Sequence, residues 1–139
     1  RMFGICYESM QEIHNALNSF FTANPNGVYL LVGHSRGCVD IYNALMTYHP
    51  ALRKQVLVLG VAPAKFIDRE YCLDVRHLVS RDDYVYLTDP LGFARCRSTI
   101  EVLDSHPNAS WFDHSFDSPT YAPHIQQQTR NAILHKKFK

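Results

Sequence analysis

The run Gly33-His34-Ser35-Arg36-Gly37 decides the fold of this chain. It follows five apolar residues, Val28-Tyr29-Leu30-Leu31-Val32, and precedes a stretch whose apolar residues recur at helical spacing. A strand that turns sharply into a helix around such a serine is typical of a nucleophile elbow, in which a strained backbone exposes the hydroxyl. Glycines two residues before and after the serine leave room where a side chain would clash. The pattern therefore predicts Ser35 at a bend between a strand and a helix.

Apolar runs and helical patterns alternate along the rest of the chain. This order predicts an α/β domain with a mostly parallel sheet flanked by helices. The stretch 82–97 is the least regular and is long enough to be a functional loop. The expected elements are helices over 8–23 and from the elbow to before Pro50, strands over 28–32, 55–61, 75–79 and 98–103, a short helix over 65–72, and a last helix with Thr120 as its N-cap.

Length, charge and composition limit the classes of protein to which this chain could belong. The 139 residues fit one domain, and the formal charge of +1 points neither to nucleic acid nor to an anionic membrane as a partner. No apolar run has the length that would predict a transmembrane segment. The sequence leaves the oligomeric state open.

The cysteines are scattered at Cys6, Cys38, Cys72 and Cys96. Because no C-x-x-C pair occurs, neither a zinc site nor a disulfide framework is expected. Buried free thiols in a reducing compartment such as the cytoplasm are the default interpretation of this spacing. We expect no metal and no organic cofactor.

From about residue 8 to the last helix, the chain resembles the C-terminal part of an α/β-hydrolase of the lipase/esterase kind. The most specific part of this resemblance is 28–38, where the small residue Cys38 follows the second glycine. The resemblance implies a partial α/β-hydrolase fold with catalytic residues in the order Ser, Asp or Glu, His, each on a loop at the carboxyl edge of the sheet. It makes Ser35 the expected nucleophile.

The family's acid is expected after the third strand, where Asp82 and Asp83 are adjacent. The spacing of Asp83, Tyr84 and Val85 resembles the family pattern of acid, spacer and apolar residue. Asp83 is therefore the expected acid, with Asp82 as the alternative.

The family's base is expected between the fourth strand and the last helix. His114 stands just before the turn into that helix, in a run that resembles the histidine loop of lipases. His106 and His124 are the alternatives on position alone. His34 is expected to pack and form hydrogen bonds, because its side chain leaves the backbone beside the serine.

The resemblance makes the backbone N–H of Arg36 one donor to the oxyanion. The second donor normally comes from a loop after an earlier strand, which would lie upstream of residue 1. We therefore expect 1–139 to be a single hydrolase-like domain from the C-terminal part of a longer protein. The runs 33–38 and 113–121 are also similar to a family of large uncharacterised chlamydial proteins with a hydrolase-like C-terminal part.

Three functions are compatible with these patterns. The first is a serine hydrolase that cleaves carboxylic esters or thioesters of small molecules or lipids through a Ser-His-Asp triad and an acyl-enzyme. The second is a catalytically silent hydrolase-like domain that serves as a binding or effector module. The third is a flavodoxin-like or other doubly wound domain with a phosphate ligand at 35–37.

Overall fold

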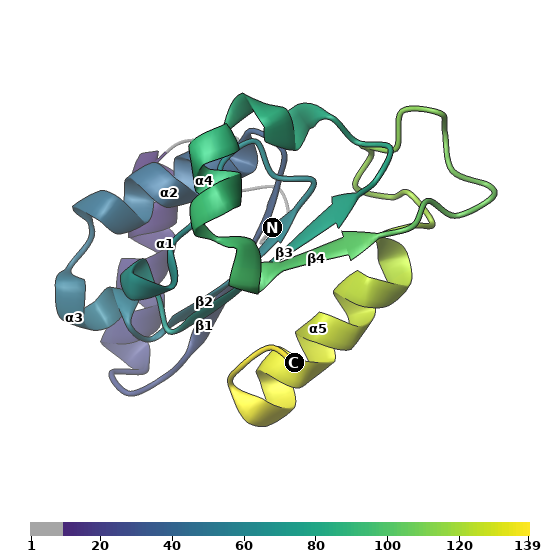
Figure 1. Cartoon of the computed structure of the whole chain (residues 1–139). Helices are drawn as coiled ribbons and strands as arrows, with labels where there is room; N and C mark the ends of the chain where they lie inside the picture. The colour runs from purple at the N-terminus through teal and green to yellow at the C-terminus, as the bar shows by residue number, and fades with distance from the viewer. Residues whose placement is uncertain (1–9) are drawn as a thin grey trace.

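Four parallel strands form a single sheet in a computed structural model that describes residues 10–139 (Figure 1). Their spatial order is the same as their order in the chain, and every neighbouring pair is parallel. The prediction of an α/β fold with a mostly parallel sheet is therefore confirmed. The strands are β1 (Tyr29–His34), β2 (Val56–Val61), β3 (Asp74–Ser80) and β4 (Ile100–Leu103).

Helices cover both faces of this sheet. On one face, α1 packs on α2 and α2 packs on β1. On the same face, α4 lies over β3 and β4 (Figure 1). On the opposite face, α5 packs on β2. The helices are α1 (Met10–Ala23), α2 (Gly37–Thr47), α3 (Pro50–Arg53), α4 (Pro90–Arg95) and α5 (Ala122–His135), with short 3₁₀ turns η2 (Arg69–Tyr71), η3 (Val85–Thr88) and η4 (Arg97–Thr99).

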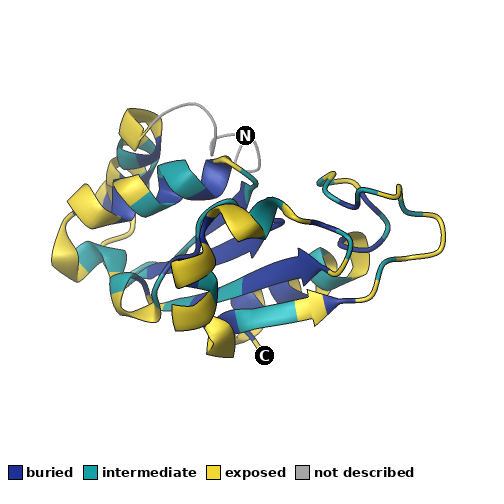
Figure 2. Ribbon diagram, turned by 45° about the horizontal axis from the view of Figure 1, so that its top comes forward, coloured by how far each residue is buried: buried dark blue, intermediate teal, exposed yellow. Residues whose placement is uncertain are grey.

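Strand β2 shows why these residues form a central strand. All six of its residues are buried, and its side chains alternate between two cores. Val56 and Val58 pack with α1 and α2, whereas Leu57 and Leu59 pack with α5. A strand that is buried on both faces has apolar residues at successive positions, whereas a half-exposed strand alternates apolar and polar residues. Figure 2 shows this buried centre beneath exposed helix surfaces.

The boundaries differ from the predictions in several places. The predicted strand 98–103 begins only at Ile100, after η4, and helix α3 was not predicted. The predicted helix 65–72 is only the 3₁₀ turn η2 (Arg69–Tyr71), and the stretch 82–97 contains η3 and α4 instead of irregular loop alone. The N-cap prediction is wrong: α5 begins at Ala122 with Tyr121 in the cap position, because the Thr120 hydroxyl instead donates to the Asp113 carboxylate. Residues 8 and 9 of the first predicted helix lie outside the described residues.

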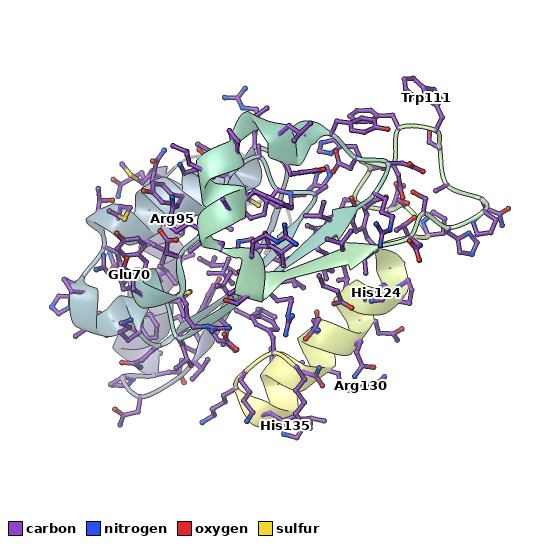
Figure 3. The ribbon with its side chains drawn as sticks, viewed as in Figure 1. Glu70, Arg95, Trp111, His124, Arg130 and His135 are labelled. Carbon is purple, nitrogen blue, oxygen red and sulfur yellow. The ribbon has the colours of Figure 1, made fainter. Side chains whose placement is uncertain are left out.

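The carboxyl ends of the strands meet at one edge of the sheet. Ser35 follows β1 directly, Asp83 lies three residues after β3, and His114 lies in the long loop between β4 and α5. That loop extends away from the sheet, and Trp111 at its outer part is 86% exposed (Figure 3). Within the described residues, β1 and β4 are the edge strands.

Candidate active site

Ser35 lies at the bend between β1 and α2 with a backbone φ of 56°. This left-handed conformation costs a residue with a side chain roughly 1–2 kcal/mol. Three hydrogen bonds hold the bend: Ser35 N–H donates to Val61 O, and Ser35 O accepts from Cys38 N–H and Ala64 N–H, each at 3.1 Å. The surrounding backbone therefore imposes the strained conformation that the sequence predicts.

Gly33 explains why the bend can be so tight. A Cβ atom at this position would lie 2.7 Å from Ile41 Cδ1 and 3.2 Å from Cys38 Sγ. Both neighbours belong to α2, which crosses close to the end of β1 at this point. The glycine therefore permits the close approach of helix and strand that places Ser35.

His114 links Ser35 to Asp83 across the carboxyl edge of the sheet. Its Nε2 atom lies 2.8 Å from Ser35 Oγ, and its Nδ1 atom lies 3.0 Å from Asp83 Oδ2. A carboxylate can only accept a hydrogen bond, so Nδ1 carries the ring proton of the neutral imidazole and Nε2 is free to accept from the serine hydroxyl. The structure thus brings three residues that are distant in sequence into one hydrogen-bonded chain.

Asp83 is fully buried beneath His114. Its Oδ1 accepts from Val85 N–H at 2.9 Å, and its Oδ2 accepts from the Tyr121 hydroxyl at 3.3 Å as well as from His114. For Asp82, the alternative acid, the contact with the histidine loop is made by the main chain: its carbonyl oxygen accepts a hydrogen bond from Asp113 N–H. Of the two adjacent carboxylates, Asp83 is the one that contacts His114.

The alternative bases lie in other surroundings. His106 is exposed, and its Nδ1 accepts a hydrogen bond from Asn108 N–H at 3.0 Å. His124 lies on α5 with its Nδ1 atom 3.5 Å from Glu101 Oε2 (Figure 3). The structure therefore places His114, and neither alternative, against Ser35.

Two rings flank the His114 imidazole. The Phe112 ring is nearly parallel to it, at 14° and 5.5 Å between centroids, and the His34 ring is tilted by 37° at 4.9 Å. His34 Nε2 donates to the His114 carbonyl oxygen at 2.6 Å. Burial lowers the pKa of His34, although the hydrogen bond to His114 opposes this shift. His34 therefore holds the main chain of His114, in agreement with its expected packing and hydrogen-bonding role.

The backbone N–H of Arg36 lies at the N-cap of α2, immediately after Ser35. Among the described residues, the hydrogen bonds outside the helices and strands include none donated by this N–H. The second donor was expected upstream of residue 1, which lies outside the described residues.

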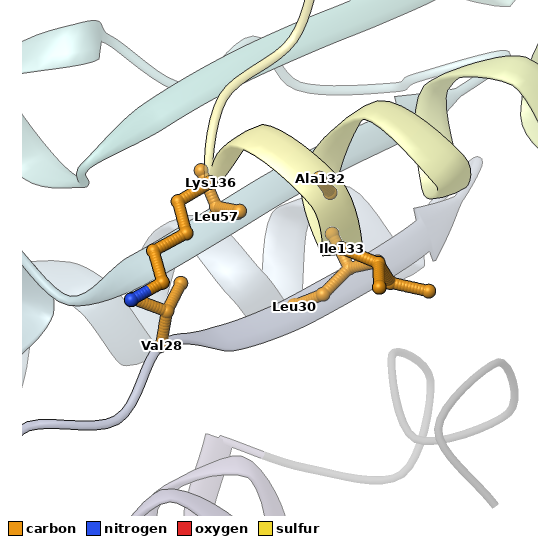
Figure 4. A pocket seen from close by; sticks show the side chains of 6 residues that line it. All are labelled: Val28, Leu30, Leu57, Ala132, Ile133 and Lys136. Atoms are coloured by element: carbon orange, nitrogen blue, oxygen red, sulfur yellow. The ribbon is translucent and has the colours of Figure 1, made fainter.

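Two grooves lie along α5. One, of about 280 Å³, runs between β1 and α5 and is lined by Val28, Leu30, Leu57, Ala132, Ile133 and Lys136 (Figure 4). The other, of about 460 Å³, is lined by Phe116, Asp117, Ala122, Ile125, Gln126 and Thr129. Phe116, which lines the second groove, packs edge-on against His34 at 5.7 Å between ring centroids.

Sequence reasoning missed the buried polar residues behind the site. Asp113 is 1% exposed and accepts hydrogen bonds from the hydroxyls of Ser80, Ser118 and Thr120. Tyr121, also buried, contacts Asp83. The available signal was an aspartate directly before the candidate base, followed by a run rich in hydroxyl side chains.

Residues 10–139 contain no cluster of three or more His, Cys, Asp or Glu side chains suited to a metal ion. In the same part of the chain, no helix is long and apolar enough to cross a membrane. Cys38, Cys72 and Cys96 are buried and reduced, and Cys6 lies outside the described residues. Burial raises the pKa of the Cys72 thiol to about 12.

Comparison with known proteins found no match to this chain among protein-family models, curated proteins or solved structures.

Proposed function

We propose that the chain is a serine hydrolase that cleaves carboxylic esters or thioesters. The observation that carries this proposal is the continuous hydrogen-bonded chain from Ser35 Oγ through His114 to Asp83, at 2.8 and 3.0 Å. The strained bend at Ser35 supports it, because such strain is concentrated at functional sites. The order of nucleophile, acid and base along the chain also supports a partial α/β-hydrolase fold.

The acylation step follows from this geometry. Ser35 Oγ attacks the carbonyl carbon of the substrate while its proton passes to His114 Nε2, a transfer that typically contributes ~10²–10⁴-fold to the rate. Asp83 accepts from Nδ1–H and stabilises the imidazolium that forms. The Arg36 N–H donates to the oxyanion of the tetrahedral intermediate, an interaction whose loss typically costs on the order of 10²–10³ in turnover.

Collapse of this intermediate breaks the bond to the leaving group. His114 Nε2–H gives its proton to the departing alkoxide or thiolate, and Ser35 remains acylated. In the second half, His114 takes a proton from water as the water oxygen attacks the acyl carbon. The carboxylic acid then leaves and Ser35 Oγ recovers its proton from His114. No metal or organic cofactor is required by these steps.

The apolar groove beside Phe116 suggests the kind of substrate. Its lining combines the apolar side chains of Phe116, Ala122 and Ile125 with those of Asp117, Gln126 and Thr129. The Phe116 ring packs on His34, whose ring packs on His114. An ester with an extended hydrocarbon group fits this surface, because burying each methylene contributes about 0.8 kcal/mol. A small-molecule or lipid ester with an apolar acyl group is therefore the proposed substrate class.

Labelling with a fluorophosphonate probe tests the proposal. We expect the wild-type chain to be labelled, and Ser35→Ala and His114→Ala to remain unlabelled. His106→Ala is the matched control and should label like the wild type. A folded wild-type chain that reacts no faster than Ser35→Ala would reject the hydrolase and favour the alternative of a silent binding or effector domain.

A further inference from the structure

Tyr121 lies beneath the candidate triad and is fully buried. Its hydroxyl oxygen accepts from Ser80 N–H at 3.1 Å, and its proton faces two acceptors, Asp83 Oδ2 at 3.3 Å and Asp113 O at 3.1 Å. Asp83 Oδ2 is the same oxygen that binds His114 Nδ1. Tyr121 is therefore one hydrogen bond away from the acid and two away from the base.

The phenol is held in place from both ends. Its ring packs in the core under the sheet with Leu78 and Leu103. At its polar end, the main chain of Asp113 and the end of β3 fix the hydroxyl. Burial strongly raises the pKa of Tyr121, and the nearby carboxylates of Asp83 and Asp113 raise it further. The side chain is consequently a neutral donor throughout the ordinary pH range.

The Asp113 carboxylate makes this arrangement rigid. Its hydroxyl partners come from the end of β3 (Ser80) and from the turn before α5 (Ser118 and Thr120). Burial alone would raise the pKa of Asp113, but the hydrogen bonds from Ser118, Thr120 and Ser80 outweigh it and lower the pKa. Asp113 thus ties the loop that carries His114 to the strand that precedes Asp83.

We propose that Tyr121 is a positioning residue for the Ser35–His114–Asp83 triad. This inference rests on the proposed function. The phenol donates to Asp83 Oδ2, which orients that oxygen toward His114 Nδ1 and withdraws negative charge density from it. A weaker negative charge on Oδ2 attracts the imidazolium less strongly. Tyr121 therefore acts through Asp83 on the orientation of His114 and on how strongly Asp83 stabilises the imidazolium that forms during the reaction.

Replacement of Tyr121 by Phe removes the hydroxyl and keeps the ring. In the fluorophosphonate reaction, we expect the rate on the high-pH plateau to fall roughly tenfold, as for a small misplacement of reacting groups. We also expect the acid limb of the pH–rate profile to move to higher pH by about half a unit, because Asp83 then holds the imidazolium proton more strongly.

Ser118→Ala is the matched control. It removes a hydrogen bond from the same buried network, but Ser118 bonds to Asp113 and not to Asp83. It should lower the melting temperature without moving the acid limb. If Ser118→Ala moves the acid limb as far as Tyr121→Phe does, loosening of the network explains both and the positioning role is wrong.

If Tyr121→Phe does not fold, a chain with 3-fluorotyrosine incorporated at position 121 provides a second test. It keeps the shape of the side chain and makes the phenol a stronger donor, so the acid limb should move to lower pH. An unchanged acid limb in this variant overturns the inference even though the wild type is labelled. A wild type that is not labelled at all rejects the proposed function itself, and the inference with it.

Discussion

The Nε2 atom of His34 lies 2.6 Å from the carbonyl oxygen of His114, 80 residues further along the chain. A carbonyl only accepts, so His34 must donate through Nε2–H. The residue next to Ser35, the candidate nucleophile, therefore holds the main chain of the candidate base. The contact joins the elbow to the loop between β4 and α5, which has no regular secondary structure of its own from 104 to 121.

Replacing His34 tests this contact. We expect His34→Leu to lower the fluorophosphonate reaction rate roughly tenfold, because the His114 carbonyl loses its donor and the loop loses a fixed point. In His34→Gln, the side-chain amide places an N–H near the original Nε2, so most of the rate should return. Equal losses in both variants would show that ring packing, and not the hydrogen bond, holds the loop.

Asp83→Asn and Asp82→Asn separate two carboxylates that the sequence alone leaves as alternatives. Asparagine at 83 presents an amide where His114 Nδ1–H needs an acceptor, or forces the wrong tautomer. The reaction rate should therefore fall on the order of 10³–10⁴-fold. Asp82→Asn should change the rate less than about threefold, because a surface carboxylate away from the imidazole adds little. A larger loss in Asp82→Asn than in Asp83→Asn would contradict the assignment.

The elbow and the sheet could be predicted from sequence because their signals are local. The apolar run before Ser35 and the glycine two residues before it belong to one short segment. In the structure this segment is strand β1 followed by the bend at Ser35, as predicted. The local pattern of acid, spacer and apolar residue favoured Asp83 over Asp82, but only the path of the chain after β3 shows which carboxylate contacts His114. The contacts of Tyr121 with Ser80 and Asp83 span 41 and 38 residues, so no pattern within a short window indicates them.

Thr120 shows a local rule that tertiary structure overrides. A threonine before a proline-containing helix start is a reasonable N-cap. However, its hydroxyl donates to buried Asp113 and accepts from His106 N–H at 2.9 Å. Taking one of its three hydroxyl donors from the buried Asp113 carboxylate costs more than leaving a helix end to solvent. The helix therefore begins one residue later than predicted, at Ala122 with Tyr121 in the cap position.

His77 in β3 makes the stability of the fold depend on pH. It is fully buried, its Nε2 accepts from Ile67 N–H, and its Nδ1 donates to Thr99 Oγ1. Burial lowers its pKa to about 3. In the unfolded chain the ordinary value is about 6.5. Between these values the unfolded state binds more protons, so the stability is complete above about pH 6.5 and is lost as the pH falls.

Chemical denaturation at two pH values measures this effect. From pH 7.5 to pH 5, we expect the free energy of unfolding of the wild type to fall by about 2 kcal/mol through His77. His77→Gln keeps an acceptor for Ile67 N–H but does not titrate, so the fall should be smaller by that amount. His106→Gln is the control, since His106 is exposed. A fall of the same size in His77→Gln and the wild type would contradict the assignment.

The groove beside Phe116 predicts how the substrate's chain length affects the rate. Ala122 lines this groove and is exposed at the first position of α5. Glutamate there places a carboxylate in the apolar groove, while an acid in the first turn of a helix is compatible with its dipole. Ala122→Glu should therefore leave stability nearly unchanged.

We expect Ala122→Glu to lower kcat/KM for an octanoyl ester about tenfold relative to an acetyl ester. The reason is that losing contact with about two methylenes costs nearly 1.6 kcal/mol, roughly a factor of ten. Gln127→Glu adds the same charge to an exposed position of α5 that does not line the groove, and should leave the ratio unchanged. If both variants keep the wild-type ratio of octanoyl to acetyl hydrolysis, the acyl chain lies elsewhere. A selective loss in Ala122→Glu would place the acyl chain along α5.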